Sequence, residues 1–371
     1  MKRSKRQMRQ LLILCLVLVL VAAGYFTAVA INKAAEKRSA EENKKSEIVI
    51  SSLADVVSME VHNRNGTFLL SRDAAGEWQL DNYDDFPMRP TKITYITFDL
   101  TPLKGERKLP LTESPESYGF GEGCTSVKAT DSMGVTVDLL VGSPTGYKYY
   151  YMLRGGDTVY IAGSTLAEDL EFTLMDIAQP YSFHEMSEQS LLNVRYTTGG
   201  HTYYVDKDVG YDEAGQVAYT FYISVDGGKR YAFEGLQFAE NVVIDTEKGW
   251  YFRRGLGCLD VFLNMWEDFY THNCIAYQPT PEQLEEYGLT REKAEAIVEM
   301  DYTWKNVDYH YTLYIGNLIP DENGSTESGE FRYAWIEGRS VLETAAAADL
   351  DAFRLLYETI PQGFADGPKT T

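Results

Sequence analysis

The longest apolar run in the chain extends from Leu11 to Ile31, twenty-one residues without a charged side chain. At a rise of about 1.5 Å per residue, a helix of this length matches the roughly 30 Å hydrocarbon core of a bilayer. Five lysines and arginines precede the run, and the first nine residues include no acid. Because basic flanks stay in the cytoplasm, the pattern predicts a single-pass transmembrane helix over 11–31. It also predicts a cytoplasmic tail over 1–10 and an extracytoplasmic remainder.

A removable signal peptide is the alternative interpretation of this run, because Ala28-Val29-Ala30 resembles a small-x-small cleavage site. The apolar region of a signal peptide is about 7–15 residues long, and this run is longer. A retained anchor is therefore favoured, and cleavage stays open. Cys15 does not fit a lipidation site, because Leu14 precedes it inside the apolar run. It is read as a small apolar residue of the membrane helix.

The pattern changes after the predicted helix. Residues 32–47 are charged, contain alanine and lack glycine and proline, as expected of a polar stalk that continues a helix. From Ile48, apolar and polar residues alternate, and Asn65-Gly66 and Ala75-Gly76 separate the runs. Such alternation between turns predicts an antiparallel meander. Pro90-Thr91 then predicts the start of a short amphipathic helix.

Further short strands are predicted from Leu111 onward, and a helix-like run around Leu170 to Ile177 closes this part of the chain. Strand-like segments begin again at Leu192 and continue to Phe252. The sequence CLDVFLNMWEDFY, which predicts a helix, and the segment NCIAYQP come next. Both halves of the chain therefore combine short antiparallel strands with a few short helices.

The features of the first half return in the second half in the same order. Ser114-Pro115-Glu116 leads to Tyr118-Gly119, and Thr280-Pro281-Glu282 leads to Tyr287-Gly288. Fixed spacing of unlike features over about 100 residues is the signature of an internal repeat. The pattern predicts two tandem modules, over 48–182 and 188–361, followed by a tail over 362–371.

Three further correspondences support the repeat. An apolar strand ends at Gly142 in the first copy and at Gly316 in the second. The tyrosine-rich strand that follows leads to Gly155-Gly156 or to Gly338. The closing segments place Phe353 opposite Phe172.

The repeated residues have sufficient structural explanations. Gly142 and Gly316 are expected in turns that need a positive φ. The Ser/Thr-Pro-Glu triplets suit the start of a helical turn with a hydroxyl cap, and Tyr-Gly closes it while the tyrosine packs on the sheet. We expect the following ten residues to form a structural signature: Pro115, Tyr118, Gly119, Gly142, Phe172, Pro281, Tyr287, Gly288, Gly316 and Phe353.

This combination resembles the bacterial family called domain of unknown function 4340, over nearly all of residues 48–361. The resemblance rests on the repeated [ST]PE…YG pattern, the apolar strand ending in glycine, the tyrosine-rich strand and the closing helix. Members are similar to auxiliary components of ABC-type exporters, including those linked to gliding motility, so the resemblance implies such a role. It supplies no catalytic residues. The second copy departs from the pattern at DENGSTESGE and at the DVGYDEAGQ hairpin.

The charge and the cysteine content of the chain limit the classes of partner and of fold that it can have. The chain holds 34 Lys and Arg against 55 Asp and Glu, a net charge of −21. An acidic chain argues against nucleic acid and against electrostatic attachment to anionic lipid. Outside the membrane run the cysteines are Cys124, Cys258 and Cys274. This odd, sparse set is no disulfide scaffold; Cys258 and Cys274 either pair or remain buried free thiols.

No pattern for catalysis or cofactor binding stands out. His272 and Cys274 are neighbours without further ligands at zinc spacing. Asp206, Asp208 and Asp212 hint at calcium, but the glycine and glutamate of an EF-hand loop are missing, so a solvated hairpin turn is favoured. The glycine-rich stretches lack the Walker lysine. We expect no metal and no cofactor.

The sequence predicts an α+β fold in which an N-terminal transmembrane helix precedes two tandem repeats, each a mainly antiparallel sheet with short helices. We expect a non-enzymatic, membrane-anchored extracytoplasmic accessory protein at the cell membrane. Its expected partner is an ABC-transporter permease or another envelope protein. A glycan- or protein-binding module of the cell envelope, using some of the 27 tyrosines, is the alternative. An extracytoplasmic hydrolase with an unrecognised site is a further alternative.

Overall fold

The computed structural model describes residues 48–183, 187–233, 242–245, 250–252, 257–320, 325, 329–351, 353–354 and 357. The predicted tail 1–10, membrane helix 11–31, stalk 32–47 and tail 362–371 lie outside these residues. Within the described part of the chain, no helix is long and apolar enough to cross a membrane. The described residues form two compact units, one containing those up to Thr67 together with Tyr95–Glu171, the other containing Phe68–Thr94 together with those from Phe172 onward. The module limits 48–182 and 188–361 remain a prediction.

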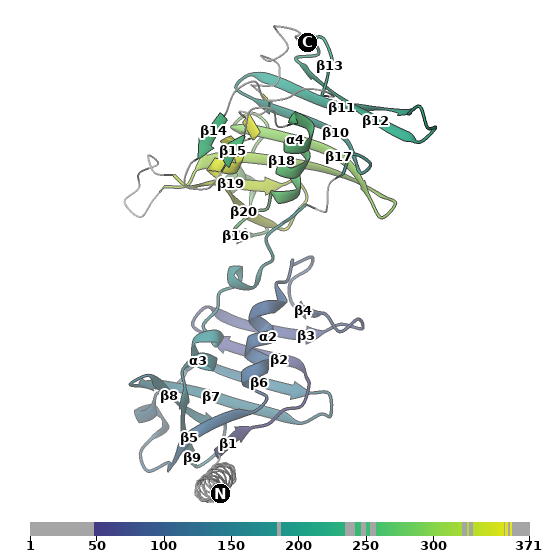
Figure 1. Cartoon of the computed structure of the whole chain (residues 1–371). Coiled ribbons are helices and arrows are strands. Elements are labelled where there is room, and N and C mark those ends of the chain that lie inside the picture. Colours follow the sequence, from purple (N-terminus) through teal and green to yellow (C-terminus); the bar gives the residue numbers. More distant parts are fainter. Residues whose placement is uncertain are drawn as a thin grey trace, which may run out of the picture. The chain divides into compact units, whose positions relative to one another are not determined.

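The first sheet contains nine strands in the order β1-β5-β9-β8-β7-β6-β2-β3-β4 (Figure 1). The predicted meander around Asn65-Gly66 and Ala75-Gly76 is confirmed as β2, β3 and β4. The strands are β1 (Ile48–Ser51), β2 (Val56–Asn63), β3 (Gly66–Arg72), β4 (Trp78–Leu80), β5 (Leu103–Pro110), β6 (Ser126–Asp131), β7 (Thr136–Thr145), β8 (Lys148–Leu153) and β9 (Thr158–Gly163).

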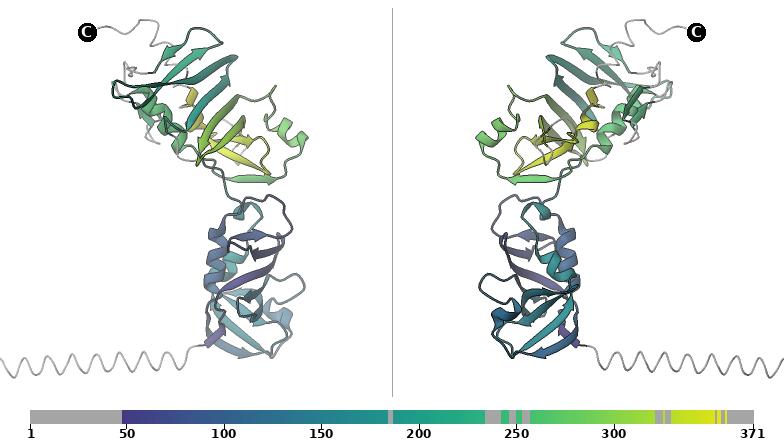
Figure 2. Two further views of the ribbon diagram at one scale, coloured as in Figure 1. Left: turned by 90° about the vertical axis from the view of Figure 1, so that its right-hand side faces the viewer. Right: turned by 90° about the vertical axis from the view of Figure 1, so that its left-hand side faces the viewer.

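Short helices accompany this sheet (Figure 2). The predicted helix at Pro90 is confirmed as α2 (Pro90–Asp99), which buries Ile93 and Ile96 on one face. The predicted closing helix is wrong in extent, because α3 (Thr165–Leu170) ends where Phe172 enters the core. The 3-10 helices are η1 (Pro115–Tyr118) and η2 (Met175–Ile177).

The second sheet also contains nine strands, in the order β13-β12-β11-β10-β17-β18-β19-β20-β16. Its strands are β10 (Leu191–Thr198), β11 (His201–Tyr211), β12 (Val217–Val225), β13 (Tyr231–Ala232), β16 (Cys274–Tyr277), β17 (Ala296–Trp304), β18 (Val307–Leu318), β19 (Phe331–Ile336) and β20 (Val341–Ala346). A separate pair consists of β14 (Val242–Asp245) and β15 (Trp250–Phe252). The predicted strand-like stretch Leu192–Phe252 is therefore confirmed.

One face of the second sheet is covered by α4 (Cys258–Asp268), the helix predicted from CLDVFLNMWEDFY (Figure 1). Phe262 and Trp266 of this helix are fully buried against the strands. Phe353, in the C-terminal helical segment, stacks on Trp266 with ring centroids 4.3 Å apart. The short helix α5 (Pro281–Glu286) precedes β17. The coarse prediction of an α+β fold, mostly antiparallel sheet with few helices, is confirmed.

The two sheets share the order of eight strands. In the first this order is β5-β9-β8-β7-β6-β2-β3-β4, and in the second it is β16-β20-β19-β18-β17-β10-β11-β12. The β3–β4 and β11–β12 hairpins close with the same turn. Asp73 Oδ1 accepts hydrogen bonds from the backbone N–H groups of Ala75 and Glu77. Asp212 Oδ1 likewise accepts from those of Ala214 and Gln216. The hairpin-turn interpretation of Asp212 is thus confirmed.

Candidate functional site

Gly142 and Gly316, the two signature glycines in strands, each lie against the backbone carbonyl of a signature tyrosine. A Cβ atom added at Gly142 would lie 2.3 Å from the carbonyl oxygen of Tyr118, and one added at Gly316 would lie 2.1 Å from that of Tyr287. The expected positive φ at these two positions is wrong, because both residues lie inside strands, in β7 and β18. Glycine is required here because the Tyr-Gly turn approaches the strand too closely for a side chain.

The signature tyrosines pack on equivalent strands. Tyr118 meets Tyr150 of β8 edge-to-face at 5.4 Å, and Tyr287 stacks on Tyr333 of β19 at 4.2 Å. With Gly142 and Gly316 taken as equivalent, the strand registers align Tyr150 with Tyr333. The glycines that follow each tyrosine, Gly119 and Gly288, do adopt positive φ, +89° and +74°.

The remaining signature residues have local structural positions. Pro115 and Pro281 begin η1 and α5. Phe172 is buried and lies 4.7 Å from the ring of Phe68. The ten signature residues therefore occupy turns, helix starts and packing contacts.

The two proline-led turns differ in their caps, which gives a first testable prediction. Thr280 forms a capping box with Gln283, whereas Ser114 makes no side-chain cap. Thr280→Ala should therefore destabilise the protein by about 1 kcal/mol, and Ser114→Ala by clearly less. Urea unfolding of the two variants checks this. Equal losses would show that the box at Thr280 has no energetic role.

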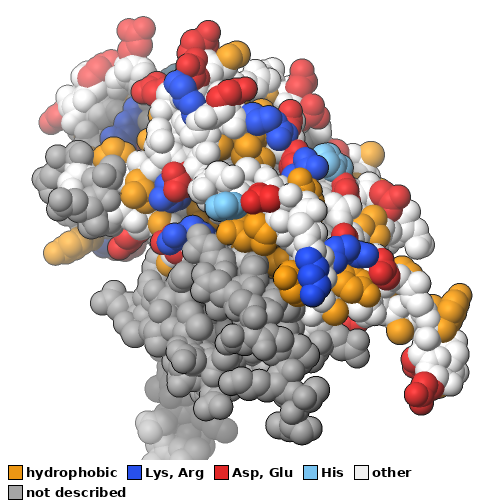
Figure 3. Space-filling view, turned by 90° about the horizontal axis from the view of Figure 1, so that it is seen from above, with side chains coloured by type: hydrophobic (Ala, Val, Ile, Leu, Met, Phe, Trp, Pro, Cys, Tyr) orange, Lys and Arg blue, Asp and Glu red, His pale blue; other side chains and the backbone are white. Residues whose placement is uncertain are grey.

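The candidate functional site is a shallow hollow of about 440 Å³ on the solvent-facing side of the second sheet. It crosses four neighbouring strands, β11, β10, β17 and β18, whose outward side chains stand in rows. Figure 3 shows acidic and basic side chains interspersed with hydrophobic ones on one side of the second unit. The lining residues are Asn193, Val194, Arg195, Tyr204, Val205, Asp206, Glu299, Asp301 and His310.

The acidic side chains Glu299 and Asp301 of the hollow form hydrogen bonds and ion pairs with neighbouring residues. Glu299 accepts hydrogen bonds from Arg195 at 3.1 Å and from Arg291 at 2.8 Å. Asp301 lies 2.6 Å from Nδ1 of His310 and accepts from Asn193 at 2.8 Å. Although burial opposes it, these partners hold the pKa values of Glu299 and Asp301 below their usual range. Both groups therefore remain carboxylates at neutral pH.

These residues favour recognition over reaction. The Asp301–His310 pair has the geometry of an oriented base, but the hollow's lining includes no serine, threonine or cysteine to act as nucleophile. The guanidinium of Arg195 lies 5.1 Å from the centre of the Tyr204 ring. A second hollow of about 380 Å³ beside α2 is lined by one carboxylate, Asp99, whose pKa is raised by burial and by Asp169. A glycosidase-type site needs two carboxylates, one of them a general acid with a raised pKa. The second hollow has a single carboxylate, and in the first hollow the pKa values of Glu299 and Asp301 are both lowered.

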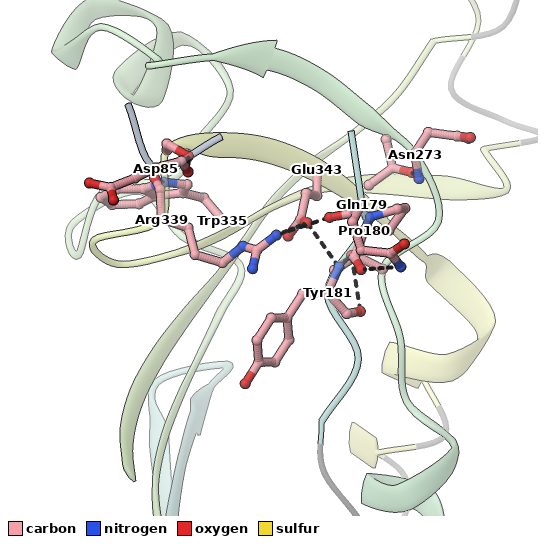
Figure 4. Close-up of polar contacts among 11 residues, drawn as sticks. Asp85, Gln179, Pro180, Tyr181, Asn273, Trp335, Arg339 and Glu343 are labelled. Carbon is pink, nitrogen blue, oxygen red and sulfur yellow. Dashed lines mark hydrogen bonds and ion pairs between the residues drawn. The ribbon is translucent and has the colours of Figure 1, made fainter. Parts of the chain in front are cut away.

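A buried ion pair missed by the sequence analysis lies on β20 (Figure 4). The Glu343 side chain is 0% exposed, and its Oε1 accepts from Arg339 at 2.9 Å and from the backbone N–H of Tyr181 at 2.9 Å. Arg339 also donates to the carbonyl oxygen of Gln179 at 3.1 Å. The pair therefore fixes the segment Gln179–Tyr181 on the second sheet.

The environment of Glu343 is strongly desolvated. Burial raises the pKa of its carboxyl, and Arg339 opposes this rise. Its Oε2 has no hydrogen-bond partner among the described residues. Arg339 and Glu343 stand four residues apart around the β19–β20 turn, a spacing that carries no signal in a strand sequence.

The cysteines and histidines do not form a metal site within the described ranges, where no group of three or more His, Cys, Asp or Glu could hold an ion. Cys124, Cys258 and Cys274 are free thiols. Burial raises the pKa of Cys258 to about 11 and that of Cys274 to about 12. The open question of a Cys258–Cys274 disulfide is thus answered by two separate thiols.

Comparison with known proteins gives one match. The family model described as Domain of unknown function (DUF4340) matches residues 78–214, which confirms the family resemblance over that part of the chain. This stretch includes the first-copy signature from Pro115 to Phe172 and ends in the β11–β12 turn. No curated protein and no solved structure matches the chain.

Proposed function

We propose that the chain is a non-catalytic, membrane-anchored accessory protein outside the cytoplasm, in keeping with the match of residues 78–214 to the DUF4340 family model. Residues 11–31 would hold it in the membrane, and its partner would be the permease of an ABC-type export system. The polar hollow supports this best, because its paired carboxylates present a fixed pattern of charge and its lining contains no serine, threonine or cysteine.

The shared order of eight strands supports a tandem duplication as the origin of the two sheets. The Tyr-Gly turn against a strand glycine, present in both units, supports the same proposal. Two related binding modules on one anchor would meet a membrane partner at a raised effective concentration. The function would then depend on placement and surface chemistry.

Co-purification tests this proposal. The full chain, solubilised in mild detergent from its own membranes, should bring a multi-pass permease with it. Reversing three charges at the hollow together, Arg195→Glu and Arg291→Glu with Glu299→Lys, keeps both ion pairs of position 299 but changes the charge pattern, so recovery of the permease should fall. The double reversal Arg154→Asp with Asp138→Arg on the first sheet is the matched control. Recovery of the chain alone, while an unrelated membrane complex survives the same detergent, would contradict the proposal.

A further inference from the structure

The β11–β12 hairpin of the second unit extends beyond the neighbouring strands (Figure 1). Its strands have 11 and 9 residues, whereas the topologically equivalent β3 and β4 have 7 and 3. Because both hairpins close with the same Asp-x-Ala-Gly turn, the difference lies in strand length. The second unit has therefore gained a projecting arm.

One face of this arm continues the core face of the sheet. Directly opposed residues share a face, and the successive pairs on this face are Val205–Ile223, Lys207–Phe221, Val209–Tyr219 and Tyr211–Val217. Val205, Phe221 and Ile223 are buried at the base. Towards the tip, Val209, Tyr211 and Val217 are 65%, 77% and 52% exposed. An apolar stripe thus runs from the core into solvent.

The edge of the core is marked by Lys207. Its Nζ donates to the carbonyl oxygens of Glu188 and Gln189, both at 2.8 Å, and lies 4.6 Å from the centre of the Tyr219 ring. Beyond this point no described residue covers the stripe. In the first sheet, counted from the shared turn, Leu70 and Trp78 occupy the positions of Val209 and Val217 and are both buried, and the position of Tyr211 is held by Arg72. The exposed stripe is therefore a property of the longer arm.

We propose that the stripe of Val209, Tyr211 and Val217 is the docking surface for a partner protein that offers an apolar groove rimmed by lysine and arginine. Contiguous exposed apolar residues with a polar border are typical of interaction sites. The border at the tip is acidic, with Asp212 and Glu213, whereas Asp208 on the other face of β11 is paired with Arg230 at 3.2 Å. This charge complements a basic rim, and it repels an anionic lipid surface. A second copy of the chain would bring another net charge of −21.

This inference depends on the proposed function only in placing the partner at the membrane. Photo-crosslinking in the native cell tests the docking surface. The photoreactive residue p-benzoylphenylalanine replaces Tyr211 in the full chain. Gly210 is the matched control position. It faces the opposite side of β11 from Tyr211, and a side chain there would have open space around it. We expect one discrete adduct with another protein from position 211, and about tenfold less from position 210.

Substitutions then test the chemistry. Val209→Asp should reduce the adduct about tenfold, whereas Ala218→Asp on the other face, opposite Gly210, should leave it within about twofold. Glu213→Lys, which leaves the turn-forming Asp212 in place, should also reduce it. The captured peptide, identified by mass spectrometry, should combine apolar residues with flanking Lys or Arg. Unchanged thermal unfolding midpoints for all variants exclude a folding defect.

Four results would overturn the inference: no adduct, an adduct within one chain, an adduct of two copies, or an adduct indifferent to Val209→Asp. The inference and the proposed function fail separately. If position 211 of the otherwise unchanged chain gives no adduct while that chain still co-purifies with a permease, the arm inference is wrong and the accessory function stands. If position 211 captures a protein from outside the membrane and Val209→Asp removes it, the arm inference stands and the permease assignment is wrong.

Discussion

Replacing Gly316 by alanine is expected to destabilise the protein by about 3 kcal/mol, because the added methyl group must displace backbone. The atom it would meet is the Tyr287 carbonyl oxygen, at 2.1 Å, and that turn is held on the strand by a hydrogen bond from the N–H of Asn317 to the same oxygen, at 2.9 Å. A carbonyl in a closed turn has no rotamer by which to avoid the clash. The strand and the turn must separate.

Gly210→Ala is the matched control for this prediction. Gly210 also lies in a strand of the second unit, without a positive φ, and a Cβ there meets nothing within 4 Å. Its replacement should change the stability by about 0.5 kcal/mol or less, in the stabilising direction if at all. Denaturant unfolding of both variants in detergent gives the comparison. Equal stability of the two variants would show that the Tyr-Gly turn does not rest on the strand.

Removing the partly buried cation Arg339, whose side chain is 21% exposed, is the second change with a large expected effect. Arg339→Ala should destabilise the protein by about 3–5 kcal/mol, because it leaves the Glu343 carboxylate buried without its counter-charge. The double variant Arg339→Met with Glu343→Leu should recover most of this loss, since neither charge then remains. The backbone N–H of Tyr181 keeps an acceptor in that variant, Thr271 Oγ1 at 2.6 Å.

The loss in Arg339→Ala should depend on pH with a defined sign. Without Arg339, burial raises the pKa of Glu343 further, so the folded protein holds a proton that the unfolded chain has released. Stability therefore falls as the pH rises above the ordinary glutamate value of about 4.3. Unfolding measured between pH 5 and pH 7 should show a deficit that grows with pH relative to the double variant. A deficit independent of pH would mean that Glu343 is not the group responsible.

Local features of the chain were predictable because short-range patterns determine them. The turns at Asn65-Gly66 and Ala75-Gly76 and the helix at Pro90 depend on neighbouring residues alone. The equivalence of Gly142 and Gly316 was also visible in the sequence, but its cause was not. The contact with the Tyr-Gly turn joins segments more than twenty residues apart. In the sequence, a glycine needed for a turn cannot be distinguished from a glycine needed because another segment packs closely against the strand.

Features that depend on which strands pair could not be predicted from the sequence. Glu343 is one of many acids in the chain, and only its place on β20, opposite Cys274 and Ala334, buries it. In the sequence, the stripe on the β11–β12 arm has the alternation of apolar and polar residues that any half-buried strand has. This alternation does not show at which residue the underlying core ends. The hollow likewise requires Asn193, Asp301 and His310 to meet in one row across three strands.

The central proposal is that two β-sheet units are held by one membrane helix beside a membrane partner. The most direct measurement compares recovery of a permease by the full chain and by a chain in which a cleavable signal peptide replaces residues 1–31. The account predicts stoichiometric recovery with the native segment and a loss of about tenfold or more without it, because the raised effective concentration disappears. Recovery of the full chain without any membrane protein, or equal recovery by both forms, would contradict it.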